Sequence, residues 1–194
     1  MVTVVAGGEC LAAAVPVLDT NPLPKAYNLT VTFGVSATGS EPSDPQLSAD
    51  SGWGFPLRIS VDARDWLTFS ALAIFSDDTA FGGGAKLTLL NDVEHWLGWG
   101  INILVLFRDG YEELHGQSIL SWNIRKRSTW VPYLAVVPGY LRSPNRPLLS
   151  VNGGLRIGRF RDYLGVKLDI IAEGGYETLT FKTWNMSTGI AVLW

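Results

Sequence analysis

Residues 27–38 read YNLTVTFGVSAT, a stretch in which apolar and polar side chains alternate at every position. The odd-numbered positions from Tyr27 to Ala37 are apolar, while the even-numbered positions are Asn, Thr, Gly or Ser. Because a β-strand points successive side chains to opposite faces, this period of two predicts a strand with one apolar and one polar face.

The same alternation recurs along the rest of the chain. It appears in the runs 53–61, 66–75, 81–90, 96–107, 113–124, 147–160, 163–174 and 178–194. The run 130–141 is apolar on both faces, so its register stays open, and the last run changes phase near Trp184, which predicts a β-bulge. Together these runs predict ten strands.

Apart from 39–52, the connections between these runs are short, and no long helical pattern intervenes, which favours sequential antiparallel pairing. An open meander of this length would leave two exposed edges, and closure into a barrel removes them. We therefore expect residues 27–194 to form an all-β, closed, antiparallel up-and-down barrel of ten strands, or of twelve if residues 1–18 add two more.

The polar face indicates which side of the barrel is inside. It consists mainly of Thr, Ser, Asn and Gly with few charges, whereas the surface of a soluble domain usually carries many more charges. A membrane barrel turns its apolar face to lipid and its polar face to the lumen, while a soluble lipocalin-like barrel does the reverse. We expect a transmembrane barrel, with a soluble ligand-binding barrel as the alternative.

Aromatic residues gather toward the ends of the predicted strands, as expected at the headgroup level of a bilayer. Tyr27, Trp99, Trp122 and Trp194 fall at one end, and Phe75 and Phe107 at the other.

Composition excludes several classes of function. The net charge is −3 with no basic cluster, so a nucleic-acid partner is not expected. Two histidines and one cysteine, Cys10, form no metal-ligand set, and no motif implies a cofactor. Residues 1–26 are rich in small apolar side chains but lack a basic n-region, so we expect a periplasmic segment that binds a partner or adds to the barrel.

The C-terminus, STGIAVLW, resembles the assembly signal that ends bacterial outer-membrane β-barrel proteins. The matching positions are the polar Ser187, Gly189, the apolar Val192 and the terminal aromatic Trp194. The resemblance implies the outer membrane of a Gram-negative bacterium, contact with outer-membrane lipid, recognition by the barrel assembly machinery, and chain termini that face the periplasm.

His115 is the candidate catalytic residue. It falls on the polar face near the outer end of its strand, beside Glu112 and Glu113, with Asp77 or Asp78 as further acidic candidates. A His–carboxylate pair can activate water or a serine, and outer-membrane proteases of the omptin class and lipid A deacylases carry His and acidic residues at such a rim. The alternative is a histidine that only hydrogen-bonds within the lumen.

Several other polar residues are expected to line the lumen: Arg58, Lys86, Gln117, Asn152, Arg156, Lys167, Asp169 and Glu173. They would form either a polar path or a network that fills a narrow interior. The first hypothesis for function is therefore a structural or anchor subunit of an envelope complex. The alternatives are a narrow channel for small polar or anionic solutes and a rim hydrolase that uses His115 on lipid A or peptides.

Overall fold

The structure, a computed structural model, describes residues 29–40, 51–76, 79–90, 95–108, 111–123, 130–142, 145–161, 167–179 and 182–194. These residues form strands whose bounds are β1 (Leu29–Ser40), β2 (Ser51–Arg64), β3 (Leu67–Phe75), β4 (Ala80–Leu90), β5 (Leu97–Arg108), β6 (Tyr111–Trp122), β7 (Trp130–Leu141), β8 (Arg146–Arg161), β9 (Lys167–Glu177) and β10 (Thr183–Leu193). Among the described residues there is no helix long and apolar enough to cross a membrane.

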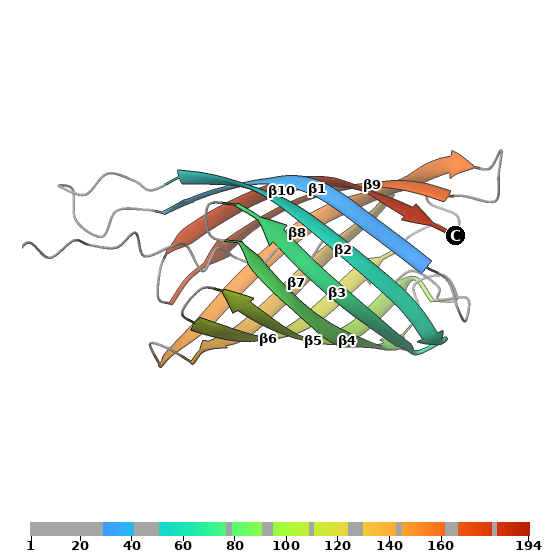
Figure 1. Cartoon of the computed structure of the whole chain (residues 1–194). Helices are drawn as coiled ribbons and strands as arrows, with labels where there is room; N and C mark the ends of the chain where they lie inside the picture. The colour runs from blue at the N-terminus through green and yellow to red at the C-terminus, as the bar shows by residue number, and fades with distance from the viewer. Residues whose placement is uncertain are drawn as a thin grey trace, which may run out of the picture.

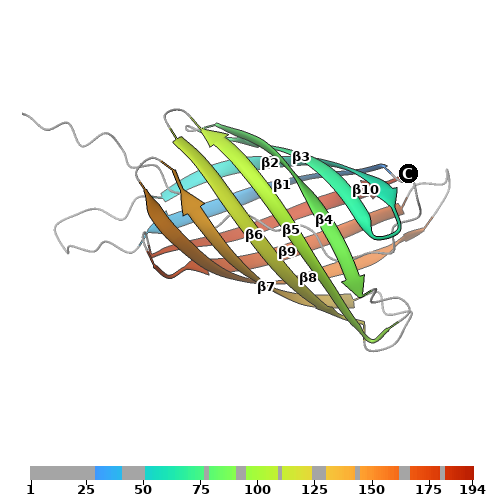
Figure 2. The ribbon, with the colours of Figure 1, turned by 90° about the horizontal axis from the view of Figure 1, so that it is seen from below.

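The strands form one closed antiparallel barrel in which each strand pairs with its neighbours in sequence (Figures 1 and 2). The ring is closed by β1 and β10, which pair from Thr30↔Leu193 to Ser40↔Thr183 without interruption. The predicted ten-strand barrel is confirmed. The twelve-strand alternative rests on residues 1–18, which lie outside the described residues; the described strands close the ring without them.

The barrel has two distinguishable ends. We call the end where β1 begins and β10 stops the terminal end; there, the Trp194 N–H donates to the Leu29 carbonyl oxygen over 3.0 Å. The opposite end, where β1 stops and β10 begins, is the distal end (Figure 1).

The polarity of the barrel is inverted relative to that of a soluble protein. Alternation is regular in β10, where Thr183, Asn185 and Ser187 are buried while Trp184 and Met186 are exposed. The other strands also turn their apolar faces outward, and the exposed set includes Phe33, Ile59, Phe69, Leu87, Ile103, Leu114, Val136, Val151 and Ile170. An apolar outer face of this kind is typical of a barrel that contacts lipid.

Aromatic side chains border this apolar surface, as the sequence predicts. Phe75 and Phe107 lie at the distal end and are exposed. They belong to a row across β2 to β5, because Phe55 pairs with Phe75 and Phe81 pairs with Phe107, and the Phe75 and Phe81 rings meet edge to face at 6.3 Å. Trp99 and Trp194 are exposed toward the terminal end, and Trp122 at the same end is partly buried. Tyr27 lies outside the described residues.

The bulge predicted near Trp184 is wrong. The pairing of β10 with β9 and with β1 passes Trp184 without a register shift. The apparent change of phase comes from the turn before the strand, where Lys182 has a φ of 49° and the strand begins one residue later. The irregular positions are Asp62/Arg64, Thr88/Leu90 and Gly158/Phe160, all toward the terminal end.

Candidate functional site

The interior of the barrel holds the charged and polar side chains from which any site must be built. The most buried of them include Asn102, Glu113, Ser121 and Asn152, each with 0% of its surface exposed. Buried charges are costly unless they are paired or hydrogen-bonded, so the partners of these groups decide what the interior can do.

A cation–carboxylate–histidine group lies at the distal end between β5 and β6. The Glu113 carboxylate accepts from Arg108 Nε at 2.9 Å and lies 2.7 Å from His115 Nε2. All three side chains are at most 5% exposed. The His115 ring extends over Gly139 of β7, where an added Cβ would lie 2.8 Å from Nδ1. Glu113 therefore holds two neighbours in place.

The adjacent Glu112 shows how alternation separates two carboxylates. Its side chain points outward and accepts a hydrogen bond from Arg142 Nη1 at 2.9 Å, and both side chains are largely exposed. The prediction that Glu113 accompanies His115 fits this geometry, and the same prediction for Glu112 is wrong because successive side chains of a strand point to opposite faces. Asp77 and Asp78 lie outside the described residues.

A second carboxylate at the distal end, Glu177, organises the turn between β9 and β10. Its Oε1 accepts from the backbone N–H of Leu179 at 2.9 Å and of Leu149 at 3.3 Å, and its Oε2 accepts from Lys182 N–H at 3.1 Å. The carboxylate is bound by backbone groups, which is a structural role.

In the middle of the barrel, a tyrosine crosses one strand to reach a carboxylate. Tyr133 of β7, Gly154 of β8 and Glu173 of β9 are in register across the three strands. The Tyr133 ring lies over Gly154, which has no side chain to obstruct it, and its hydroxyl donates to Glu173 Oε2 at 2.5 Å. Asn152 Nδ2 donates to the other oxygen, Oε1, at 2.9 Å.

Toward the terminal end, Arg156 of β8 bonds Asp169 of β9, with Nε 2.6 Å from Oδ2 and Nη2 on the same oxygen. Asp169 lies over Gly158, its register partner, so glycine again leaves the space that a polar side chain fills. Across the barrel wall formed by β2 to β4, Arg58 Nη2 donates to Ser70 Oγ at 3.2 Å, and Lys86 is buried with 3% exposed.

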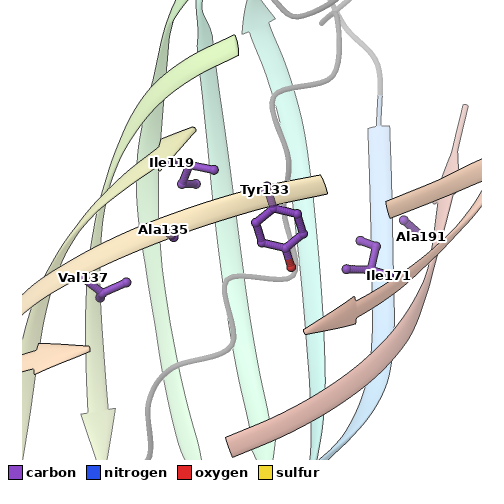
Figure 3. Close-up of a cluster of buried hydrophobic side chains, with 6 residues drawn as sticks. All are labelled: Ile119, Tyr133, Ala135, Val137, Ile171 and Ala191. Atoms are coloured by element: carbon purple, nitrogen blue, oxygen red, sulfur yellow. The ribbon is translucent and has the colours of Figure 1, made fainter. Parts of the chain in front are cut away.

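Apolar side chains also occupy the interior. One cluster combines Tyr133 with Ile119, Ala135, Val137, Ile171 and Ala191 from β6, β7, β9 and β10, and Figure 3 shows the Tyr133 ring between its two halves. A second cluster on β3 to β5 consists of Leu72, Ile74, Ala80, Leu104 and Leu106. The strand 130–141, whose register the sequence leaves open, contributes the odd-numbered Tyr133, Ala135 and Val137 to the inside.

The arrangement around His115 is not that of an activated nucleophile. Its Nε2 faces Glu113 and its Nδ1 has no hydrogen-bond partner, so no described serine bonds to the ring. The described residues also contain no cluster of three or more His, Cys, Asp or Glu side chains that would suit a metal ion. In the group of Arg108, Glu113 and His115, the carboxylate compensates the positive charge of the arginine within the barrel wall.

The structure places most of the predicted lumen residues on the inner face. Arg58, Lys86, Gln117, Asn152, Asp169 and Glu173 are buried, and Arg156 is partly buried beside Asp169. Lys167 is the first residue of β9, but its side chain lies outside the described part of the structure.

Sequence reasoning missed Arg108, Tyr133 and Glu177 as members of these groups. In the sequence, Arg108 begins the polar stretch RDGYE and Glu177 ends the stretch GGYE, both of which are typical of turns, whereas the structure places Arg108 at the end of β5 and Glu177 at the end of β9. The inward parity of Arg108 with Asn102 and Leu104 was the available signal for that residue.

The four positions of the C-terminal signal lie on the closing strand and just beyond it. Ser187 and Gly189 face inward, while Trp194 is exposed at the terminal end. Only the backbone N–H of Trp194 takes part in the contact with Leu29.

We expect Trp194→Ala to reduce severalfold the amount of folded barrel in the membrane of cells. In contrast, the same variant refolded in detergent should reach the wild-type yield, since the backbone contact with Leu29 is kept. The measurement is the fraction of unheated protein that runs at the folded position on a gel. Trp130→Ala removes a comparably exposed ring at the same end and is the control; an equal loss in both variants would contradict a role as a signal.

A closed, even-stranded, antiparallel barrel with an apolar belt outside, bordered by aromatic rings, and polar groups inside defines a class of protein. The described residues thus have the architecture of a small transmembrane β-barrel.

No protein-family model matches the sequence, and no curated protein does. Among solved structures, the chain is similar to Neisserial surface protein A, with 12% identity, a TM-score of 0.34 and coverage of 85% of this chain and 95% of that one. It is also similar to the outer membrane protein OprG from Pseudomonas aeruginosa, with 12% identity, a TM-score of 0.38 and coverage of 91% and 99%. For Ail, the attachment invasion locus protein of Yersinia pestis, the identity is 8%, the TM-score 0.34 and the coverage 88% and 100%. At these values the likeness says nothing about function.

Proposed function

We propose that this protein is a non-conducting barrel with a structural role, an anchor or scaffold of the cell envelope. The observation that supports the proposal is the pairing of the interior charges with one another. Arg108 is bonded to Glu113, Arg156 to Asp169, and Glu173 to Tyr133 and Asn152. In a network of this kind each charged side chain is bonded to a partner within the wall, which stabilises the wall.

The channel alternative requires interior cations that a passing anion can reach. Arg58 and Lys86 are 5% and 3% exposed, and both lie at inward positions of β2 and β4. Solute that followed this wall would have to displace buried side chains from their contacts. The interior geometry therefore favours the structural role over a channel.

The hydrolase alternative requires a histidine that can take a proton from a nucleophile or water near substrate. His115 is 4% exposed, and its only hydrogen bond among the described residues is to Glu113. A histidine in this state positions a carboxylate, and we assign it no catalytic role.

In this proposal the functional surface is the outside of the barrel and its two rims. The outward face contacts outer-membrane lipid, and partner proteins of the envelope bind at the ends of the barrel. Recognition by the barrel assembly machinery through the C-terminal signal belongs to the same proposal.

The proposal predicts that the purified full-length chain, reconstituted into planar bilayers, gives no stepwise ionic current. Its folded state is first verified by the shift between unheated and boiled protein on a gel. Steps whose size or ion selectivity changes in Arg156→Ala would contradict the proposal and support the channel. Hydrolysis of lipid A or peptide that is lost in His115→Ala would support the rim enzyme instead.

A further inference from the structure

The outward face of the barrel carries an isolated ion pair at the distal end. Among the described residues of β5, β6 and β7, Glu112 has the one charged side chain that points outward. It is bonded to Arg142, the residue that follows β7. Glu112 is also the register partner of Phe107, an exposed ring at the edge of the apolar surface. Because charges are costly among acyl chains, the pair is suited to the headgroup level of a bilayer.

The ion pair uses only part of the Arg142 guanidinium. The backbone N–H of Arg142 donates to the Glu112 carbonyl oxygen at 3.0 Å, which places the two residues side by side. In the side chain, Nη1 donates to Glu112 Oε2 at 2.9 Å, while Nε and Nη2 bond no other described residue. The Arg142 side chain is 78% exposed. An arginine has five N–H donors in a planar fork, so it can bond a carboxylate and a phosphate at the same time.

A second arginine lies next to this one. Arg146, the first residue of β8, pairs in register with Leu141 and is therefore beside Arg142 across the β7–β8 hairpin. Its side chain is exposed, whereas Arg108 is bonded to Glu113 inside the wall. Two exposed arginines thus accompany one exposed carboxylate on this part of the rim. The positive excess among these described residues fits an anion.

The surface below the two arginines is apolar and faces lipid. Tyr140 precedes Arg142 by two residues on the same outward face and is 42% exposed. Its register partners are Leu114 of β6 and Pro147 of β8, and both are exposed. An acyl chain can lie against this row while its phosphate stays at the arginines. A free phosphate ion would gain nothing from the row, so a lipid fits the whole surface better.

We propose that Arg142, with Arg146 beside it, binds the phosphate of an anionic lipid in the leaflet at the distal end. The lipid's acyl chains lie on the row of Leu114, Tyr140 and Pro147. Glu112 accepts from one edge of the Arg142 guanidinium and leaves the other edge to the phosphate. The inference rests on the proposed function only where that function places the outer face in lipid, and it gives this contact a lipid class and a position.

Native mass spectrometry of the folded full chain, released from detergent, tests the inference. The probes are phosphatidic acid, which carries a phosphate monoester, and phosphatidylcholine at the same concentration. We expect the barrel to retain phosphatidic acid in preference, and Arg142→Gln to lower this retention about fivefold, the effect of one basic residue near a membrane surface. Lys182→Asn is the control, because it removes an exposed cation at the same end and asparagine tolerates the φ of 49°.

Three results would overturn the inference. Equal losses in Arg142→Gln and Lys182→Asn would show general attraction to the rim. Displacement of the lipid by an equal concentration of inorganic phosphate would show an anion site without a lipid. A dimer mass that disappears in Arg142→Gln would assign the pair to contact between two copies of the chain. Each variant is first checked for the gel shift of the folded barrel.

The geometry of the guanidinium is tested by Arg142→Lys. Lysine keeps the charge but lacks the planar fork, so it cannot bond Glu112 and a phosphate with two separate edges. We expect retention of phosphatidic acid between that of the wild type and that of Arg142→Gln, and a lysine variant equal to the wild type would contradict the two-edged contact. These experiments read mass and not current. Loss of the lipid site would leave the non-conducting barrel in place, and current steps would leave the lipid result unchanged.

Discussion

Replacing Glu113 with alanine is expected to lower the free energy of unfolding by about 3–5 kcal/mol, the usual effect of removing one partner from a buried ion pair. Arg108 and His115 both bond this carboxylate, and all three side chains are almost completely buried. Without Glu113, the Arg108 guanidinium stays charged in a place that water does not reach. The measurement is equilibrium urea unfolding of the barrel in lipid vesicles, followed by tryptophan fluorescence and the gel shift.

The neighbouring residue supplies a matched control. Glu112 carries the same carboxylate one position earlier, but its ion pair with Arg142 is on the exposed face. Exposed ion pairs contribute roughly 0–1 kcal/mol, so Glu112→Ala should leave the free energy of unfolding nearly unchanged. A second variant separates pairing from burial: Arg108→Met with Glu113→Leu and His115→Leu should recover much of the loss, since apolar replacement of a whole buried ionic group is often tolerated. Equal losses in Glu112→Ala and Glu113→Ala would contradict the assigned roles.

The sequence predicts the barrel because apolar and polar residues alternate within almost every strand. The alternation in 27–38 or 113–124 identifies a strand without knowledge of the strand that pairs with it. The short turns then favour pairing between strands that follow one another in the sequence. The prediction weakens where both faces are apolar. For β7 the inward choice of Tyr133, Ala135 and Val137 depends on contacts with Ile119, Ile171 and Ala191, which lie far away in sequence.

The interior groups are less predictable, for a physical reason. Parity places Asp169 and Glu173 inside, but it does not say which cation or hydroxyl reaches each one. Tyr133 and Glu173 are 40 residues apart in the sequence. They can bond because the residue between them in register, Gly154, has no side chain to block the Tyr133 ring. Gly139, Gly154 and Gly158 leave room for the side chains of His115, Tyr133 and Asp169 on neighbouring strands, and only the register reveals these pairs.

Replacing Gly154 with valine is therefore expected to be strongly destabilising. An added Cβ would overlap the Tyr133 ring, so the ring would have to turn away from β8. The variant would lose the bond from the Tyr133 hydroxyl to the Glu173 carboxylate, worth about 1.5–3 kcal/mol for a hydrogen bond to a charged group. Overpacking of the interior adds about 1–3 kcal/mol, so we expect a total loss on the order of 3–5 kcal/mol.

The adjacent glycine again provides the control, because Gly153 faces outward with its nearest neighbours, Leu134 Cδ1 and the Tyr133 carbonyl oxygen, at 4.0 Å from an added Cβ. Gly153→Val should be close to neutral in the same urea titration. If the Tyr133 ring is the cause of the loss, Tyr133→Ala should destabilise the wild-type barrel but cost much less when Gly154 is already valine. Additive losses in this double-mutant cycle would contradict the contact, since side chains that touch are expected to couple. A barrel that accepts valine equally at both glycines would show that Gly154 is not a space reserved for the tyrosine.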